Sequence, residues 1–168
     1  FNHLMDQARE VFEEPLDLKM AEALIGNFDE YGFLKTPLLE ISILNEFDEK
    51  SLERVLNDIQ TFDPMGVGAI NLQESLLIQL KKLGKKNTLS YQIIQHHYDD
   101  LLHHRISLIK KGLKCSEELI SLALSKDIAK LDLHPGIGFT SEPVHYIIPD
   151  ITIKEEGDDF VIFVNDDP

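Results

Sequence analysis

The sequence predicts a mainly α-helical protein, arranged as two small helical bundles in tandem with a C-terminal β-hairpin extension. Apolar residues recur at intervals of three and four over most of the 168 residues, and polar capping residues precede several of these stripes. Both features are typical of amphipathic helices. After Pro135 the pattern changes to runs rich in β-branched and aromatic residues, which favour strands. We expect the first bundle over residues 1–85, the second over 86–135 and the extension over 136–168.

The first bundle is predicted from a succession of apolar stripes. The first stripe covers residues 1–12, the second is capped by Asp17, and a short helical segment covers 37–44. Asp48 and Asn71 are placed to cap the next two helices, because Asp and Asn side chains accept hydrogen bonds from the free N–H groups of a first turn. The residues expected on these stripes are Phe1, Leu4, Met5, Ala8, Val11, Phe12, Leu18, Ala21, Leu24, Ile25, Phe28, Leu52, Val55, Leu56, Ile59, Phe62, Leu72, Leu76, Leu77, Leu80 and Leu83.

The second bundle is expected after the short polar linker "GKKNT" at 84–88. A helical segment follows near 106–111, then a turn at Gly112-Leu113 and a helix capped by Ser116, giving six or seven helices in the whole chain. The apolar residues on its stripes are Tyr91, Ile94, Tyr98, Leu101, Leu102, Ile106, Ile109, Ile120, Ala123, Leu124, Ile128 and Leu131.

The C-terminal extension is predicted to contain a hairpin that turns at "EEGDD" within "HYIIPDITIKEEGDDFVIFVN". Pro149 lies in the first arm, and a proline has no N–H to donate, so this arm is expected at a sheet edge or to be interrupted. A lone hairpin is marginally stable in water, so we expect it to dock on the helices or on another chain.

The net charge excludes some partners and favours others. Thirty acidic residues against sixteen Lys and Arg give a net charge of −14, the opposite of what neutralising DNA phosphates requires. Such acidity suits a basic protein surface, where complementary charge speeds encounter. The alternative is that it only keeps the protein soluble.

Other features of the composition bound the cellular setting. The single cysteine, Cys115, excludes an internal disulfide and is consistent with a reducing cytoplasm. No membrane span or secretory leader is recognisable, so we expect a cytoplasmic protein without a membrane partner. The chain starts within a helical stripe and ends after a strand-like run, so we expect a fragment of a longer protein.

The stretch "FDPMGVGAINLQESLLIQL" at 62–80 raises the question of a phosphate-binding loop. A P-loop needs G-x-x-x-x-G-K-[ST], and a dinucleotide fingerprint needs a third glycine and a preceding strand; neither is present. The residue types instead predict a corner between two helices, with turn, glycine and capping residues in order. The corner residues are Phe62, Asp63, Pro64, Gly66, Gly68, Asn71 and Glu74, and a weaker echo in "NFDEYG" at 27–32 adds Asp29 and Gly32.

Two metal sites are suggested by the sequence. "NFDEYGFLKTPL" starts like an EF-hand loop, but Tyr31 and Leu38 stand where oxygen ligands are needed, which excludes calcium. On one continuous helix His96, Asp100 and either His103 or His104 would share a face and could bind zinc. A solvated helix face is the simpler interpretation, so we expect no metal and no other cofactor, and the zinc site stays an alternative.

Residues 106–127 resemble a helix-turn-helix, which makes a DNA-binding module a second alternative. In such modules the start of the second helix enters the major groove. Here that helix starts with Glu117 and Glu118, whose carboxylates would meet phosphates and base-edge acceptors. Lys110, Lys111 and Lys114 could contact the DNA backbone, but helix packing or protein contact is the stronger interpretation. No catalytic constellation is recognisable, so we do not expect an enzyme.

The motifs together resemble the bacterial sigma-54 (sigma-N) transcription factors. "TFDPMGVGAINLQESLLIQL" is similar to the family stretch F-D-P-x-G-V-G-A-R-N-L-x-E-x-L-x-x-Q-L, and "NFDEYGFLKTPLLEI" resembles its D-x-x-G-Y-L segment. "LDLHPGIGF" and "VHYIIPDITI" resemble the downstream P-x-P-G and Y-x-x-P-D. Two positions depart from the pattern: Ile70 replaces the family arginine, and the first proline of P-x-P-G is missing at Asp132-Leu133.

The resemblance implies a region that binds core RNA polymerase and performs no catalysis. Such factors contact promoter DNA and an ATP-dependent activator through other regions, which this chain is expected to lack. From the net charge we place the polymerase contact on exposed acids, together with apolar residues near the corner; the acids are Glu46, Asp48, Glu49, Glu53 and Asp58. The corner residues are expected to shape the first bundle instead.

Overall fold

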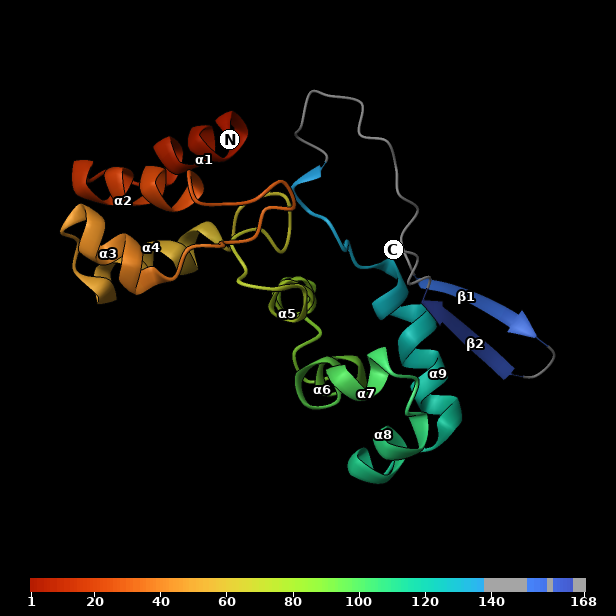
Figure 1. Cartoon of the computed structure of the whole chain (residues 1–168). Coiled ribbons are helices and arrows are strands. Elements are labelled where there is room, and N and C mark those ends of the chain that lie inside the picture. Colours follow the sequence, from red (N-terminus) through yellow and green to blue (C-terminus); the bar gives the residue numbers. More distant parts are fainter. Residues whose placement is uncertain (138–150, 157–158, 165–168) are drawn as a thin grey trace. The chain divides into compact units, whose positions relative to one another are not determined.

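The computed structural model describes residues 1–137, 151–156 and 159–164 and divides into two compact units (Figure 1). The first unit contains Phe1–Lys86 and residues 131–137, and the second contains Asn87–Lys130 and the described segments 151–156 and 159–164. The prediction of a mainly helical protein is confirmed, with nine α-helices within residues 1–137. None of the helices in the described residues has the length and apolar character that a membrane span requires.

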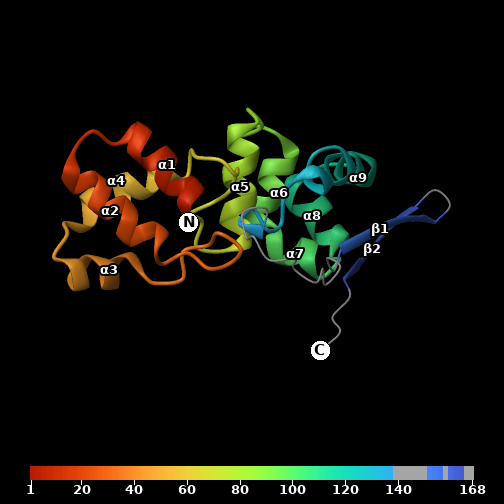
Figure 2. The same cartoon turned by 90° about the horizontal axis from the view of Figure 1, so that it is seen from above.

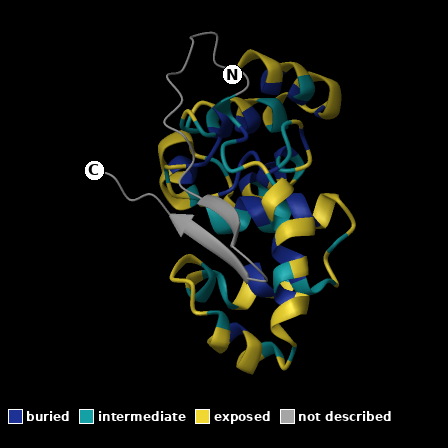
Figure 3. Ribbon diagram, turned by 90° about the vertical axis from the view of Figure 1, so that its right-hand side faces the viewer, coloured by how far each residue is buried: buried dark blue, intermediate teal, exposed yellow. Residues whose placement is uncertain are grey.

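Five helices belong to the first unit (Figure 2): α1 (Asn2–Val11), α2 (Pro15–Ile25), α3 (Leu38–Asn45), α4 (Glu49–Ile59) and α5 (Leu72–Lys82). Helix α2 packs against both α1 and α4, and α3 packs against α4. Helices α1 to α4 bury a continuous apolar core, and Figure 3 shows buried and exposed sides alternating along the helices. The largest fully buried side chains of this core are Met20, Leu24, Ile41, Leu52, Val55 and Ile59.

The helix starts in the first unit test the predicted caps. Asp48 accepts a hydrogen bond from the Ser51 backbone N–H at 2.9 Å, and Asn71 accepts one from the Glu74 N–H at 2.9 Å, which confirms both caps. The prediction for Asp17 was wrong. Helix α2 starts at Pro15, whose fixed φ suits a first helical position, and Asp17 instead pairs with Arg54 of α4 at 2.6 Å.

Four residues predicted on the apolar stripes are exposed. Phe1, Val11, Leu83 and Leu102 are 58%, 52%, 48% and 38% exposed. Each stands next to an end of its helix or at its last residue, where no neighbouring helix covers it.

The second unit contains α6 (Leu89–His96), α7 (Tyr98–Leu102), α8 (Ile106–Leu113), α9 (Glu117–Lys126) and a short 3-10 helix, η1 (Ile128–Lys130). Its small core consists of Ile93, Ile109, Ile120, Ala123 and Leu124. Ser116 caps α9 as predicted, accepting a hydrogen bond from the Leu119 N–H at 3.4 Å.

Two local predictions for the second unit were wrong, and both corrections involve His97. The stripe over 91–102 is broken at His97, so it forms two helices and the helix total exceeds six or seven. The predicted turn at Gly112 lies two residues later, at Lys114, which has a left-handed φ of 52°. Gly112 belongs to α8, and a Cβ there would collide with the His97 ring. This glycine therefore serves packing.

Two strands, β1 (Ile151–Glu156) and β2 (Asp159–Val164), pair antiparallel with Ile151 opposite Val164 and Glu156 opposite Asp159. Pro149 and the rest of 138–150 lie outside the described residues, as do Gly157 and Asp158 at the centre of the predicted "EEGDD" turn.

Candidate functional site

The glycine corner between α4 and α5 depends on two left-handed residues. Gly66 has φ 93° and Gly68 has φ 78°, a region that side chains disfavour. A Cβ on Gly66 would collide with the Ser75 Oγ and lie 2.8 Å from the Gln79 Nε2. A Cβ on Gly68 would lie 3.3 Å from the Gln60 Cγ and 3.4 Å from the Phe28 ring. The backbone angle therefore favours glycine at both positions, and lack of space excludes a side chain at Gly66.

The residues before the glycines join the corner to α1 and α5. The buried Phe62 ring packs against Phe12, with 6.2 Å between centroids. Gln7 of α1 holds the Asp63 peptide on both sides, accepting from its N–H at 2.9 Å and donating to its C=O at 2.7 Å. The Asp63 carboxylate pairs with Lys82 at 3.0 Å, and the Asp63-Pro64 peptide is cis.

Glu74, in the first turn of α5, stabilises the start of this helix together with the Asn71 cap. Its carboxylate accepts a hydrogen bond from the Ile70 backbone N–H at 2.7 Å, which forms a capping box one residue wider than the usual one. The Ile70 side chain is 58% exposed. The contact that Ile70 makes within the corner is therefore made by its backbone.

The second corner, at 27–32, is held by its own aspartate. The Asp29 Oδ1 accepts hydrogen bonds from the Tyr31 and Phe33 N–H groups, both at 2.9 Å. Its Oδ2 pairs with Lys35 at 3.0 Å. This carboxylate therefore stabilises the turn in which it lies.

The two corners contact each other through their backbones. The Gly68 N–H donates to the Gly32 C=O at 2.8 Å, and the Leu34 N–H donates to the Ala69 C=O at 2.8 Å. Gly136 lies against the same point, donating from its N–H to the Tyr31 C=O at 2.9 Å. The echo between "NFDEYG" and "TFDPMG" therefore marks two turns that meet in the fold.

Sequence reasoning missed Gln79, which fixes the segment after Leu131. This side chain is 1% exposed. It donates to the Asp132 C=O at 2.7 Å and accepts from the Asp132 N–H at 2.8 Å. The neighbouring Ser75, also fully buried, donates to the Gly66 C=O at 2.9 Å. The signal was available, because Gln79 interrupts the apolar side of its helix between Leu76 and Leu80.

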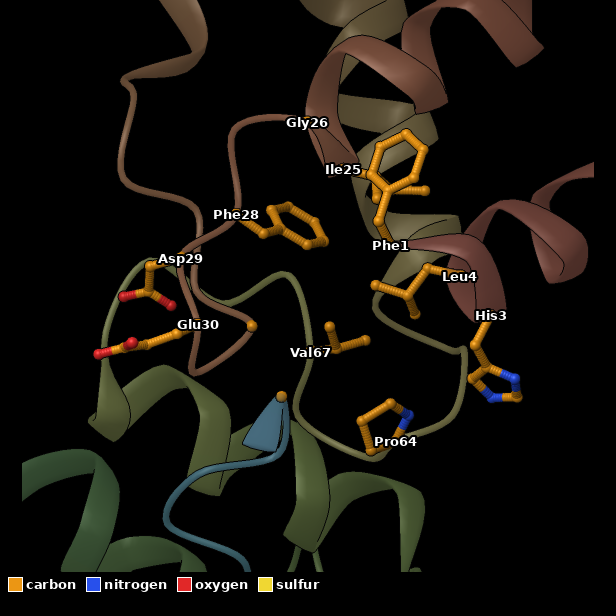
Figure 4. A pocket seen from close by; sticks show the side chains of 12 residues that line it. Phe1, His3, Leu4, Ile25, Gly26, Phe28, Asp29, Glu30, Pro64 and Val67 are labelled. Atoms are coloured by element: carbon orange, nitrogen blue, oxygen red, sulfur yellow. The ribbon is translucent and has the colours of Figure 1, made fainter. Parts of the chain in front are cut away.

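An open hollow of about 190 Å³ lies beside this junction (Figure 4). The side chains of Phe1, Leu4, Phe28 and Val67 point into it, and Glu30 lies at its edge. Its lining is mainly apolar, and His3, Asp29 and Glu30 are the polar side chains in it.

The predicted contact acids lie at the end of α3 and along α4, and they divide into two groups. Asp48 caps α4, and its hydrogen bonds from the Ser51 N–H and hydroxyl lower the pKa of the carboxyl. Asp58 lies 3.9 Å from Arg54. Glu46, Glu49 and Glu53 are exposed and make no ion pair within the described residues. Only these three have carboxylates without a structural role.

The zinc alternative loses its premise, because α6 ends at His96 and the predicted ligands do not share one helix. Asp100 binds the neighbouring His97 at 2.8 Å instead, and its other oxygen lies 3.0 Å from Arg105. These contacts lower the pKa of the Asp100 carboxyl, the hydrogen bond from His97 first. His103 contacts Asp99. In the part of the chain that the structure describes, no three potential ligands form a group that could hold a metal.

The helix-turn-helix alternative has the expected local form, since α8 and α9 pack together around Ile109 and Ile120. Helix α9 nevertheless presents Glu117 and Glu118 in its first turn. A backbone hydrogen bond and the Ser116 side chain lower the pKa of the Glu118 carboxyl. An ionised carboxylate at this position opposes the approach of phosphate.

A comparison with protein families finds one match over the whole chain. The model described as sigma-54 factor, core binding domain, matches residues 1–168. The same motifs that form the corners thus belong to a pattern that extends from the first residue to the last.

Curated relatives agree with this match. The RNA polymerase sigma-54 factor of Acidithiobacillus ferridurans is 34% identical over 142 residues, covering 82% of this chain and 30% of the relative. That of Vibrio anguillarum is 32% identical over 159 residues, covering 90% and 32%. That of Escherichia coli K12 is 32% identical over 157 residues, covering 90% and 33%. The chain therefore spans about a third of the length of these relatives.

Proposed function

This chain belongs to the family of sigma-54 factor core-binding domains, and we propose that it docks on bacterial core RNA polymerase in the cytoplasm as part of a transcription initiation factor. Sigma factors act in transcription without being catalysts, so no reaction is assigned to the chain itself. The whole-chain family match is the observation that carries this proposal.

The polymerase contact is proposed on the acidic residues around the start of α4. Glu46, Glu49 and Glu53 support it because each is exposed and none is used in an ion pair of the described fold. Carboxylates that are exposed and not ion-paired attract a basic partner electrostatically. This attraction raises the rate of association and favours basic partners over others. Asp48 and Asp58 contribute to the same field while also stabilising α4.

The rest of the chain is proposed to support and connect this surface. The two glycine corners give the first bundle, over 1–85, its shape, and residues 87–130 form a second helical module. The hairpin extension over 136–168 is proposed to lead towards the promoter-binding part of the parent protein. Promoter DNA and the ATP-dependent activator are assigned to regions of that protein beyond this chain.

The proposal is tested by measuring the affinity of the chain for bacterial core RNA polymerase over a salt series. We expect binding that weakens with salt and is competed by an intact sigma-54 factor. Replacing Glu46, Glu49 and Glu53 with lysine should weaken binding and remove most of its salt dependence.

A matched control reverses three exposed acids elsewhere in the first unit, Glu10, Glu13 and Glu22. It changes the net charge by the same amount, so it separates a local contact from a general effect of charge. Equal losses in both variants would contradict the placement, and no binding by the folded wild-type chain would contradict docking itself.

A further inference from the structure

Helix α3 is apolar on both of its sides, which is unusual for a surface helix. Its sequence is "LLEISILN". Ile41 is 1% exposed and packs in the core of the first unit, and Leu38 packs partly against the same core. Yet Leu39, Ile43 and Leu44 are 55%, 68% and 73% exposed. A helix of this composition is expected to be covered on both sides.

The exposed residues form one face. At about 100° per residue, Leu39 and Ile43 are neighbours one turn apart, and Glu40 and Leu44 lie next to them. The buried residues Ile41 and Ser42 lie on the opposite side. The outer face of α3 thus consists of Leu39, Glu40, Ile43 and Leu44, three large apolar side chains and one carboxylate. We call it the α3 face.

The α3 face is held rigidly by the residues that end the helix. The Phe47 N–H donates to the Ser42 C=O at 3.0 Å, and the Ser42 hydroxyl donates to the Phe47 C=O at 2.7 Å. Phe47 packs against the core, and Glu46 reverses the chain with a left-handed φ of 55°. Because the helix is already ordered, a partner can bind it without a large cost of ordering it.

Charge around the α3 face indicates what covers it. Residues 38–53 contain five acidic residues and a single basic one, Lys50. A second copy of this chain would bring two such acidic surfaces together, which like-charge repulsion opposes. A partner with lysine or arginine beside apolar side chains matches both the apolar residues and the acidic surroundings.

We infer that the α3 face is an apolar docking ridge for a basic protein surface, with the carboxylates of Glu46, Glu49 and Glu53 around it. The inference rests on the proposed function, since the partner is then core RNA polymerase. The apolar residues supply the buried contact, and the carboxylates steer the approach and fix the orientation. Buried apolar anchors contribute most of the affinity of such interfaces, and charges at the rim contribute mainly to the rate of association.

The test replaces Leu39, Ile43 and Leu44 together with glutamine, which keeps helix propensity and similar length while removing apolar surface. Since the three side chains are exposed in the chain alone, the fold should be retained, as checked by circular dichroism. We expect affinity for core RNA polymerase to fall by about 10- to 100-fold, while the slope of affinity against salt stays as in wild type.

The matched control replaces three similarly exposed leucines of the second unit, Leu108, Leu119 and Leu122, with glutamine. Its affinity should stay within about twofold of wild type, the range of near-neutral surface changes. Hydrogen exchange of the wild-type chain provides a measurement that does not depend on any variant. Amides of residues 38–46 should exchange more slowly when polymerase is bound.

The outcomes separate the inference from the proposed function. If the wild-type chain binds polymerase, the α3 variant binds equally well and residues 38–46 gain no protection, the inference is wrong and docking stands. If the folded wild-type chain does not bind, both are wrong. If sedimentation shows that the chain alone forms a dimer that the α3 variant cannot form, the occupant is a second copy instead.

Discussion

Replacing Gly68 with valine tests whether the glycine corner is architecture rather than interface. Gly68 has φ 78°, and its added Cβ would lie 3.3 Å from the Gln60 Cγ, 3.4 Å from the Phe28 ring and 3.5 Å from the Leu56 Cδ1. Placing an L-residue in the left-handed region costs about 1–2 kcal/mol. Overpacking by the two further methyl groups adds about 1–3 kcal/mol. We therefore expect the free energy of unfolding to fall by about 2–5 kcal/mol.

Gly84 provides the matched control for this substitution. It has a similar φ of 74°, but a Cβ there would meet nothing within 4 Å. Gly84→Val should therefore show the backbone cost without the crowding, and the difference between the two variants isolates the packing of Gly68. Both residues lie in the first unit, so the comparison is made within one cooperative structure.

The assay is urea unfolding followed by amide NMR signals of α2 and α4, with polymerase affinity measured separately on the folded fraction. Folding should be damaged first, and the folded fraction should bind normally. Unchanged stability with lost binding would refute the reasoning, because it would make the corner part of the interface. Equal destabilisation at Gly68 and Gly84 would refute the packing argument alone.

Two further predictions concern polar contacts. Gln79→Leu removes both hydrogen bonds to the Asp132 peptide. At about 0.5–1.5 kcal/mol for each bond, the free energy of unfolding should fall by about 1–3 kcal/mol, and the amides of 132–137 should exchange faster. Unchanged exchange would show that these two hydrogen bonds are not needed to hold the segment. For Asp48, hydrogen bonds from Ser51 lower the pKa of the folded state, so its stabilisation is present above the unfolded pKa of about 3.9 and is lost as pH falls through the folded pKa. The stability difference between wild type and Asp48→Ala should therefore shrink on acidification, and a pH-independent difference measured by thermal unfolding would contradict this.

Local chemistry made several features predictable. The caps at Asp48, Asn71 and Ser116 followed from short-range hydrogen bonding between a side chain and the next turn. The mainly helical fold followed from apolar periodicity, which reports one buried side whatever the partner is. Asp17 failed as a cap because two local signals competed, and the proline at the first helical position decided the start of α2.

Contacts between distant residues were not predictable in the same way. Gly112 reads as a turn residue, but its role is to leave space for the His97 ring, which comes from another helix. The position of Gln79 on the apolar side of its helix indicates burial, but its partner, the Asp132 peptide, lies 53 residues away. In both cases the deciding partner is remote in the sequence, so no local pattern specifies it.

The sequence by itself determined the helical class, the caps at Asp48, Asn71 and Ser116, the acidic character and the motifs that mark the family. The tertiary structure decided which residues remain available to a partner. Glu46, Glu49 and Glu53 look like Asp48 and Asp58 in the sequence, yet only the fold leaves their carboxylates unused. The α3 face likewise emerges only in three dimensions, because "LLEISILN" is apolar all round and burial against α4 selects which side is left for solvent.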